Sequence, residues 1–187
     1  MRKLGISIYP GKTTEEELIS YIDKSFEAGF SRIFSCLLSS TEDKEIILKK
    51  FKKVNYYAKE KGFEIILDVN PRVFDDLGIS YDNLAFFKEM GADGIRLDIG
   101  FTGLQESIMT FNKENLKIEI NMSNDTHYID TIMDYRPNKN NLIGCHNFYP
   151  HIHTGLGLEF FKKCTENFTK YGLRTAAFIT SQAKNSF

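Results

Sequence analysis

The chain has 187 residues, of which 42% are hydrophobic and 26% are charged, and its formal net charge is -1. This composition suits one globular domain with an apolar core and excludes a disordered or fibrous protein. A chain so close to neutrality offers no global basic surface, so neither nucleic acid nor an anionic membrane is an expected partner.

Seven short β-type segments alternate with helical segments along the chain. In chain order, strands are predicted at Leu4–Tyr9, Arg32–Leu37, Phe63–Val69, Gly94–Ile99, Leu116–Asn121, Leu142–His146 and Arg174–Ile179. Between them, helices are predicted at Glu15–Glu27, Asp43–Lys61, Tyr81–Met90, Leu104–Phe111, His127–Asp134 and Leu156–Tyr171. Glycine takes the left-handed cap conformation at no steric cost, so helices are expected to stop at Gly29, Gly62, Gly91 and Gly172.

Strict alternation of strands and helices predicts a parallel sheet covered by helices, which is either an open doubly wound sheet or a closed barrel. Polar residues share one parity of several strands, as Arg96 and Asp98 do, and alternate side chains of a barrel strand face its lumen. The first turn, at residues 9–12, contains no phosphate-binding glycine motif. We therefore predict an α/β fold of the TIM type, incomplete, with about seven βα units and the eighth missing from this chain.

Three acids lie at or near the ends of strands three, four and five: Asp68, Asp98 and Glu119. Active sites of such barrels form at the carboxyl ends of the strands, and glycoside hydrolysis needs two carboxylates across a pocket. We expect Glu119 to act as acid/base and Asp98 as nucleophile or electrostatic stabiliser, with Asp68 as a possible substitute. The alternative for each acid is a structural ion pair with Arg96 or a loop cap.

Other polar residues near the same rim are candidates for holding a sugar. The predicted substrate-binding residues are Tyr9, Asn70, Arg96, Asn121, Ser123, His146, Asn147 and Tyr149. Arg96 suits a bidentate contact with an anionic group, or else it pairs with Asp98. On the sixth strand, Gly144 and His146 are expected to face the lumen, and Ile143 and Cys145 to face the helices.

Three of the four histidines follow the sixth strand, so a metal site is an alternative. His146, His151 and His153 could bind zinc together with an acid. His151 and His153 lie in a predicted surface loop, however, and nothing else completes a known ligand spacing. We predict no metal and no cofactor, and keep a metal-dependent sugar-phosphate isomerase or hydrolase as the alternative function.

The cysteines and the start of the chain indicate the compartment. Cys36, Cys145 and Cys164 form an odd set without CxxC spacing, which fits a reducing compartment better than a disulfide framework. The chain begins directly with a strand-like segment, and no run of about 18 apolar residues follows. We expect a cytoplasmic protein without a signal peptide or a membrane span.

Several unusual strings follow one another in a recognisable order: residues 4–11, 32–38, 96–98, 121–124, 146–150 and 154–156. Together they resemble the N-terminal barrel of the bacterial 6-phospho-N-acetylmuramidases. The resemblance covers most of the chain, through Phe178.

This resemblance implies a cytoplasmic exo-glycosidase that splits 6-phospho-N-acetylmuramyl-N-acetylglucosamine during cell-wall recycling. The implied partner is this small phosphosugar, with no metal or nucleotide cofactor. Family members carry a smaller cyclophilin-like domain after the barrel, so residues 1–187 are expected to be the barrel domain alone, truncated before its last βα unit. A third possibility is that such a fragment is inactive. The oligomeric state is left open.

Overall fold

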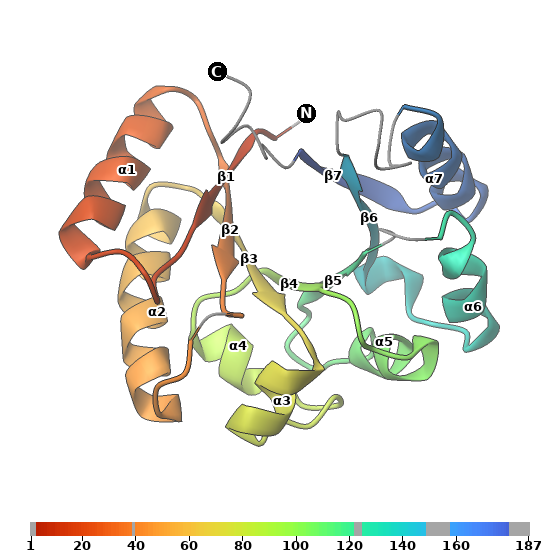
Figure 1. Ribbon diagram of the computed structural model, residues 1–187, viewed down its shortest axis with the longest axis horizontal. Helices are drawn as coiled ribbons and strands as arrows, with labels where there is room; N and C mark the ends of the chain where they lie inside the picture. Colours follow the sequence, from red (N-terminus) through yellow and green to blue (C-terminus); the bar gives the residue numbers. More distant parts are fainter. Residues whose placement is uncertain (1–2, 39, 122–124, 149–157, 180–187) are drawn as a thin grey trace.

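The computed structural model describes residues 3–38, 40–121, 125–148 and 158–179. Seven parallel strands form one sheet in which each strand pairs with its neighbours in sequence, in the order β1 to β7. The strands are β1 (Gly5–Ile8), β2 (Arg32–Cys36), β3 (Glu64–Val69), β4 (Gly94–Leu97), β5 (Lys117–Asn121), β6 (Leu142–Phe148) and β7 (Arg174–Ile179). The sheet curls strongly, with β1 and β7 as the two edges of the described part (Figure 1).

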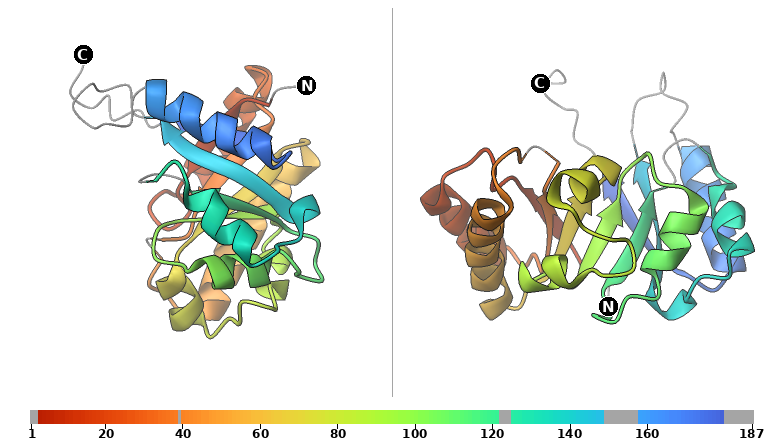
Figure 2. Two further views of the ribbon diagram at one scale, coloured as in Figure 1. Left: turned by 90° about the vertical axis from the view of Figure 1, so that its right-hand side faces the viewer. Right: turned by 90° about the horizontal axis from the view of Figure 1, so that it is seen from below.

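The helices lie outside the curve of the sheet, as the two further views also show (Figure 2). They are α1 (Glu15–Glu27), α2 (Lys44–Glu60), α3 (Pro71–Leu77), α4 (Ala85–Glu89), α5 (Gly103–Met109), α6 (Tyr128–Asp134) and α7 (Leu158–Lys170), with a 3-10 turn η1 (Lys139–Asn141) before β6. The predicted alternation of strands and helices is confirmed, and the strands form a curled partial barrel.

Local sequence signals explain where the helices begin and end. At the start of α1, the Thr14 hydroxyl accepts from the Glu17 amide at 3.3 Å, and the Glu17 carboxylate accepts from the Thr14 amide at 3.1 Å. This reciprocal capping box satisfies two amides that the helix leaves unpaired. The four glycines predicted as helix stops, Gly29, Gly62, Gly91 and Gly172, all have positive φ, so that prediction is confirmed.

The sequence prediction missed the helix after β3. Asn70 caps α3, because its Oδ1 accepts from the Val73 amide at 3.1 Å, and Pro71 occupies the first helical position. The helix predicted at Tyr81–Met90 is only the short α4. Both differences arise in helices of five to seven residues, which are too short to show a clear helical period.

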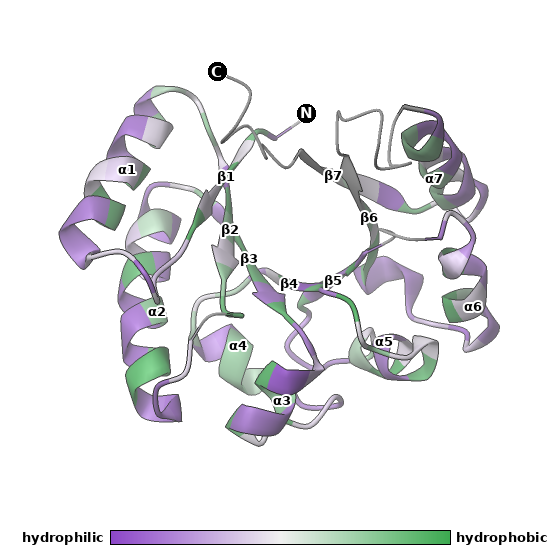
Figure 3. Ribbon diagram, in the orientation of Figure 1, coloured by the Kyte–Doolittle hydropathy of each residue, from purple (hydrophilic) through white to green (hydrophobic). Residues whose placement is uncertain are grey.

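Alternation along the strands separates an apolar face from a polar one. The residues that face the helices on β3 to β5 are almost fully buried: Ile65, Leu67, Val69, Ile95, Leu97, Ile118 and Ile120. With the apolar sides of the helices they form two core clusters: Ile65 belongs to the smaller one and the other six residues to the larger one. Hydrophilic and hydrophobic segments alternate along the helices in Figure 3. Charged and polar residues therefore collect on the concave face, where the curl of the sheet brings them together.

Strand β6 has the opposite parity to the one predicted. A Cβ on Gly144 would lie 2.4 Å from the ring of Phe168 in α7, so Gly144 faces the helices. Cys145 instead hydrogen-bonds the side chain of Arg96 and therefore faces the concave side. The expectation that Gly144 faces the lumen and Cys145 the helices was wrong, because a bulky ring from α7 needs the space that only glycine leaves.

Candidate active site

A row of side chains crosses four strands at one level of the concave face. The strand register aligns Cys36 with Asp68, Asp68 with Arg96, and Arg96 with Glu119. All four side chains share the inward parity of their strands. Cys145 of β6, which the register places opposite Asn121 rather than Glu119, contacts the row through its hydrogen bond to Arg96. The predicted acids Asp68 and Glu119 are therefore brought into one shared cluster.

Asp68 and Glu119 are both buried acids of this cluster, and Asp68 pairs with Arg96. Asp68 Oδ1 accepts from Arg96 Nη1 at 3.0 Å, and both residues are only 4% exposed. Burial raises the pKa of Asp68 to about 7, the Arg96 charge opposes this shift, and Asp98 and Glu119 add to it. Asp68 can therefore carry a proton near neutral pH, as a general acid must.

Asp98 follows directly after β4 and is half-buried. Its amide donates to the carbonyl oxygen of Val69 at 2.8 Å, which ties it to the end of β3. Its Oδ1 accepts from Asn121 Nδ2 at 3.2 Å. Asn121 thus orients the Asp98 carboxylate, while Asp98 remains the more accessible of the two aspartates.

Glu119 is enclosed by positive charge. It is 2% exposed and forms an ion pair with Arg32 of β2, which also lies 3.5 Å from the Glu64 carboxylate. Lys3 extends this network to Glu64 at 3.2 Å. Burial raises the pKa of Glu119, and Arg32 and Arg96 oppose the rise. Such an environment favours a structural ion pair, which the sequence also allowed, and a role for Glu119 as acid/base stays a prediction.

The guanidinium of Arg96 is occupied by contacts with other side chains of the protein. Besides Asp68 it binds the Cys145 thiol, and its guanidinium lies over the ring of Phe34 at 5.5 Å from the centroid. At 4% exposure the side chain is covered by these neighbours. Its partner is Asp68 rather than Asp98, the pairing that the sequence offered as an alternative to an anionic ligand.

The remaining predicted binding residues fall into three groups. Tyr9 follows β1, is 40% exposed and lies near Cys36 and Asp68, whose charges raise its pKa together with the larger effect of burial. Asn70 caps α3, and Asn121 binds Asp98. Ser123 and Tyr149 lie outside the described residues, as do the side chains of His146 and Asn147 in β6.

The sequence prediction did not include Arg32, Phe34 or Cys36 among the candidate site residues. The Cys36 sulfur lies 4.0 Å from Asp68 Oδ2, so it contacts the acid directly. Arg32, Phe34 and Cys36 occupy alternate positions on β2, which is the inward parity. The same period that identified Asp68 and Arg96 on the neighbouring strands could have found them.

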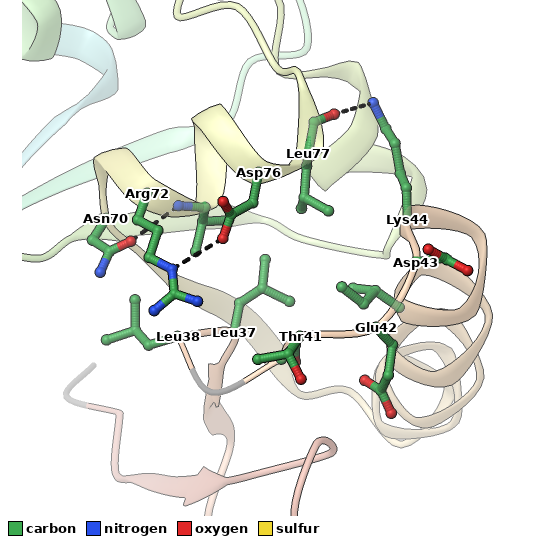
Figure 4. A pocket seen from close by; sticks show the side chains of 13 residues that line it. Leu37, Leu38, Thr41, Glu42, Asp43, Lys44, Asn70, Arg72, Asp76 and Leu77 are labelled. Carbon is green, nitrogen blue, oxygen red and sulfur yellow. Dashed lines mark hydrogen bonds and ion pairs between the residues drawn. The ribbon is translucent and has the colours of Figure 1, made fainter.

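A pocket of about 570 Å³ opens beside the end of β3 (Figure 4). It lies between the segment that leads into α2 and the helix α3, and Asn70, two residues after Asp68, lines it. Its charged lining residues are Glu42, Asp43, Lys44, Arg72 and Asp76. Because acids outnumber bases, the pocket suits sugar hydroxyls better than a phosphate.

The described residues contain no group of three or more His, Cys, Asp and Glu side chains that could hold a metal ion. His127 instead lies 3.3 Å from Asp130 on α6. The predicted alternative of a zinc site used His151 and His153, which lie outside the described residues, as does the side chain of His146. Within the described part, no helix is long and apolar enough to cross a membrane.

A family model described as "6-phospho-N-acetylmuramidase, N-terminal" matches residues 4–187. The chain belongs to this family. The match spans every strand described above, so the polar cluster lies within the 6-phospho-N-acetylmuramidase N-terminal region. The resemblance noted in the sequence is confirmed. Among curated proteins, no match was found.

Solved structures share the fold of this chain. An uncharacterized protein from B. cereus is 50% identical, with a TM-score of 0.79, and the match covers 98% of this chain and 49% of that one. A conserved protein from Enterococcus faecalis is 24% identical, with a TM-score of 0.72, covering 93% and 47%. The chain thus spans about half the length of both. An O-GlcNAc hydrolase from Thermobaculum terrenum, 13% identical over 97% of this chain and 47% of that one, shares the fold alone, with a TM-score of 0.63.

Proposed function

We propose that the chain is the N-terminal barrel domain of a glycosidase that hydrolyses 6-phospho-N-acetylmuramyl-N-acetylglucosamine in cytoplasmic cell-wall recycling. The observation that carries the proposal is the pair of aspartates, Asp68 on β3 and Asp98 just after the adjacent strand β4, which have different surroundings. Two carboxyl groups in different environments are what retaining and inverting glycosidases both require. The family assignment supports the substrate class.

Within this proposal, Asp68 donates the proton to the leaving oxygen. Its pKa of about 7 leaves a substantial protonated fraction at neutral pH, and Arg96 holds its carboxyl group in place. When the proton has left, the Arg96 charge stabilises the resulting carboxylate. Arg96 therefore has a positioning role in place of the predicted contact with the substrate.

Asp98 then acts at the anomeric carbon of the sugar. As a carboxylate oriented by Asn121, it either attacks the anomeric carbon or stabilises the oxocarbenium charge that develops there. Tyr9, exposed at the end of β1, supplies a wall for a sugar ring. The pocket beside α3, which falls in the size range of ligand sites, receives a sugar through hydroxyl contacts.

The test is hydrolysis of the phosphorylated disaccharide by the purified protein. We expect release of the two monosaccharides by the wild type, and loss of that release in Asp98→Asn. Stoichiometric bound zinc or manganese, together with loss of activity to a chelator, would support the metal-dependent alternative instead. No hydrolysis by the folded wild type would contradict the proposal.

A further inference from the structure

A third buried acid lies outside the cluster, between α5 and α6. Glu106 of α5 is 4% exposed, and its side chain hydrogen-bonds Tyr128 at the start of α6. The Tyr128 hydroxyl lies 3.3 Å from the carbonyl oxygen of Phe101, to which it donates. Among the described residues, Glu106 Oε2 has no hydrogen-bond partner. A chain of polar groups thus runs from Glu106 through Tyr128 to Phe101.

Phe101 ends the segment that carries Asp98. Its ring packs edge-on against Phe74 and Tyr81, with centroids 5.6 Å and 6.0 Å away. Gly100 in the same segment has a φ of +114°, and a Cβ there would lie 3.2 Å from Pro71 Cγ at the start of α3. The segment therefore packs closely against α3. Because the packing is close, a shift of the Phe101 carbonyl would also move Asp98 in the same segment.

The hydrogen bond to Phe101 depends on where one proton is. A tyrosine hydroxyl donates only one hydrogen bond. While Glu106 is a neutral acid, its own hydroxyl donates to Tyr128, and Tyr128 donates to the Phe101 carbonyl. Once Glu106 is ionised it only accepts, and a bond from Tyr128 to its charged oxygen is stronger than one to a neutral carbonyl. Phe101 then loses its donor.

The surroundings keep Glu106 neutral at ordinary pH. Burial raises its pKa to about 8, and the hydrogen bond from Tyr128 opposes the rise. Helix α5 packs against α6 and β5, and the residues of β5 that face it, Ile118 and Ile120, are apolar. On α6, Asp130 binds Lys170 and Tyr171. Tyr128 is thus the ionisable group among the described residues that contacts Glu106.

We propose that Glu106 and Tyr128 are positioning residues, which hold the segment from Asp98 to Phe101 only while Glu106 carries its proton. The consequence for catalysis rests on the proposed function, but the ordering of the segment does not. The neutral acid acts through Tyr128 and never touches the substrate. At alkaline pH the segment loosens, and the Asp98 carboxylate loses its fixed position.

The test is hydrogen exchange of the amides at positions 98–102, at about pH 6 and about pH 9, on either side of the pKa of Glu106. After correction for intrinsic exchange rates, we expect wild-type protection to fall about tenfold at the higher pH. Glu106→Gln keeps a donor to Tyr128 at every pH, so its protection should not change. Tyr128→Phe should show low protection at both values.

A matched control and an activity profile complete the test. Glu89→Gln, which removes an exposed acid on α4, should retain the wild-type pH dependence. If the protein hydrolyses the disaccharide, loss of the Asp68 proton should lower kcat above about pH 7 in the wild type and in Glu106→Gln alike, and only the wild type should show a further fall near pH 8. Exchange that does not depend on pH in the wild type, or depends on it equally in Glu106→Gln, would overturn the inference. Expected exchange without any hydrolysis would instead contradict the proposed function alone.

Discussion

Arg96 on β4 donates to the carboxylate of Asp68 on β3 across 3.0 Å, and both side chains are almost completely removed from solvent. Two opposing effects meet in this pair. Burial favours the neutral form of Asp68, and the guanidinium favours the charged form. Burial has the larger effect, so the pKa of Asp68 rises to about 7 in spite of its cationic partner.

This shift makes stability depend on pH. Because the pKa of Asp68 rises from 3.8 to about 7 on folding, the folded protein binds more protons than the unfolded chain between those values. Asp68 should therefore make the free energy of unfolding fall as pH rises across that window, by up to about 1.4 kcal/mol per pH unit, in addition to the falls from Glu106 and Glu119, whose pKa values folding also raises. Asp68→Asn should make the slope less steep in urea unfolding measured at several pH values. The exposed-acid control Asp134→Asn should keep it, and an equal slope in Asp68→Asn and the wild type would contradict the assignment.

The variant Glu119→Gln distinguishes a structural role of Glu119 from a catalytic one. Glu119→Gln leaves the buried site without its charge partner for Arg32, which keeps only Glu64. We expect the free energy of unfolding to fall by about 1–3 kcal/mol, with hydrolysis retained within about tenfold. Urea unfolding tests the expected loss of stability, and kcat measured on the same preparation tests the retained hydrolysis. A folded Glu119→Gln protein without any hydrolysis would restore the acid/base role that the sequence predicts.

Gly144 should not tolerate a side chain. The Cβ of Gly144→Ala would overlap the ring of Phe168, so either α7 or β6 must shift. We expect a loss of about 1–3 kcal/mol in the free energy of unfolding, measured by urea denaturation. Gly5→Ala is the comparison, because its Cβ would lie 3.3 Å from the nearest atom, the Arg32 carbonyl oxygen. Equal stability of the two variants would contradict the packing of β6 against α7.

Most of the architecture could be predicted from the sequence because it shows both the two-residue period of strands and the longer period of helices. Aliphatic residues alternate with charged ones on β3 to β5, which identifies the inward parity of Asp68 and Arg96. On β6 this signal fails. Gly144 and Cys145 are both small and carry no charge at neutral pH, so the sequence does not say which of them faces α7.

The pairing within the site could not be predicted in the same way. Which acid meets Arg96 depends on strand register, which aligns it with Asp68 and Glu119 and leaves Asp98 beyond the strand end. The ion pair between Arg32 and Glu119 joins strands that are not neighbours in the sheet. Curvature of the sheet creates that contact, and no local pattern in the sequence encodes curvature.

Hydrolysis of 6-phospho-N-acetylmuramyl-N-acetylglucosamine by Asp98→Asn, compared with the wild type and Asp134→Asn, tests the central claim most directly. Loss of a group that acts on the reacting carbon should lower kcat/KM by at least about a hundredfold, which corresponds to about 2.7 kcal/mol of transition-state stabilisation. The account predicts this loss for Asp98→Asn, with unchanged hydrolysis by Asp134→Asn and unchanged unfolding for both. Full activity in a folded Asp98→Asn protein would contradict it.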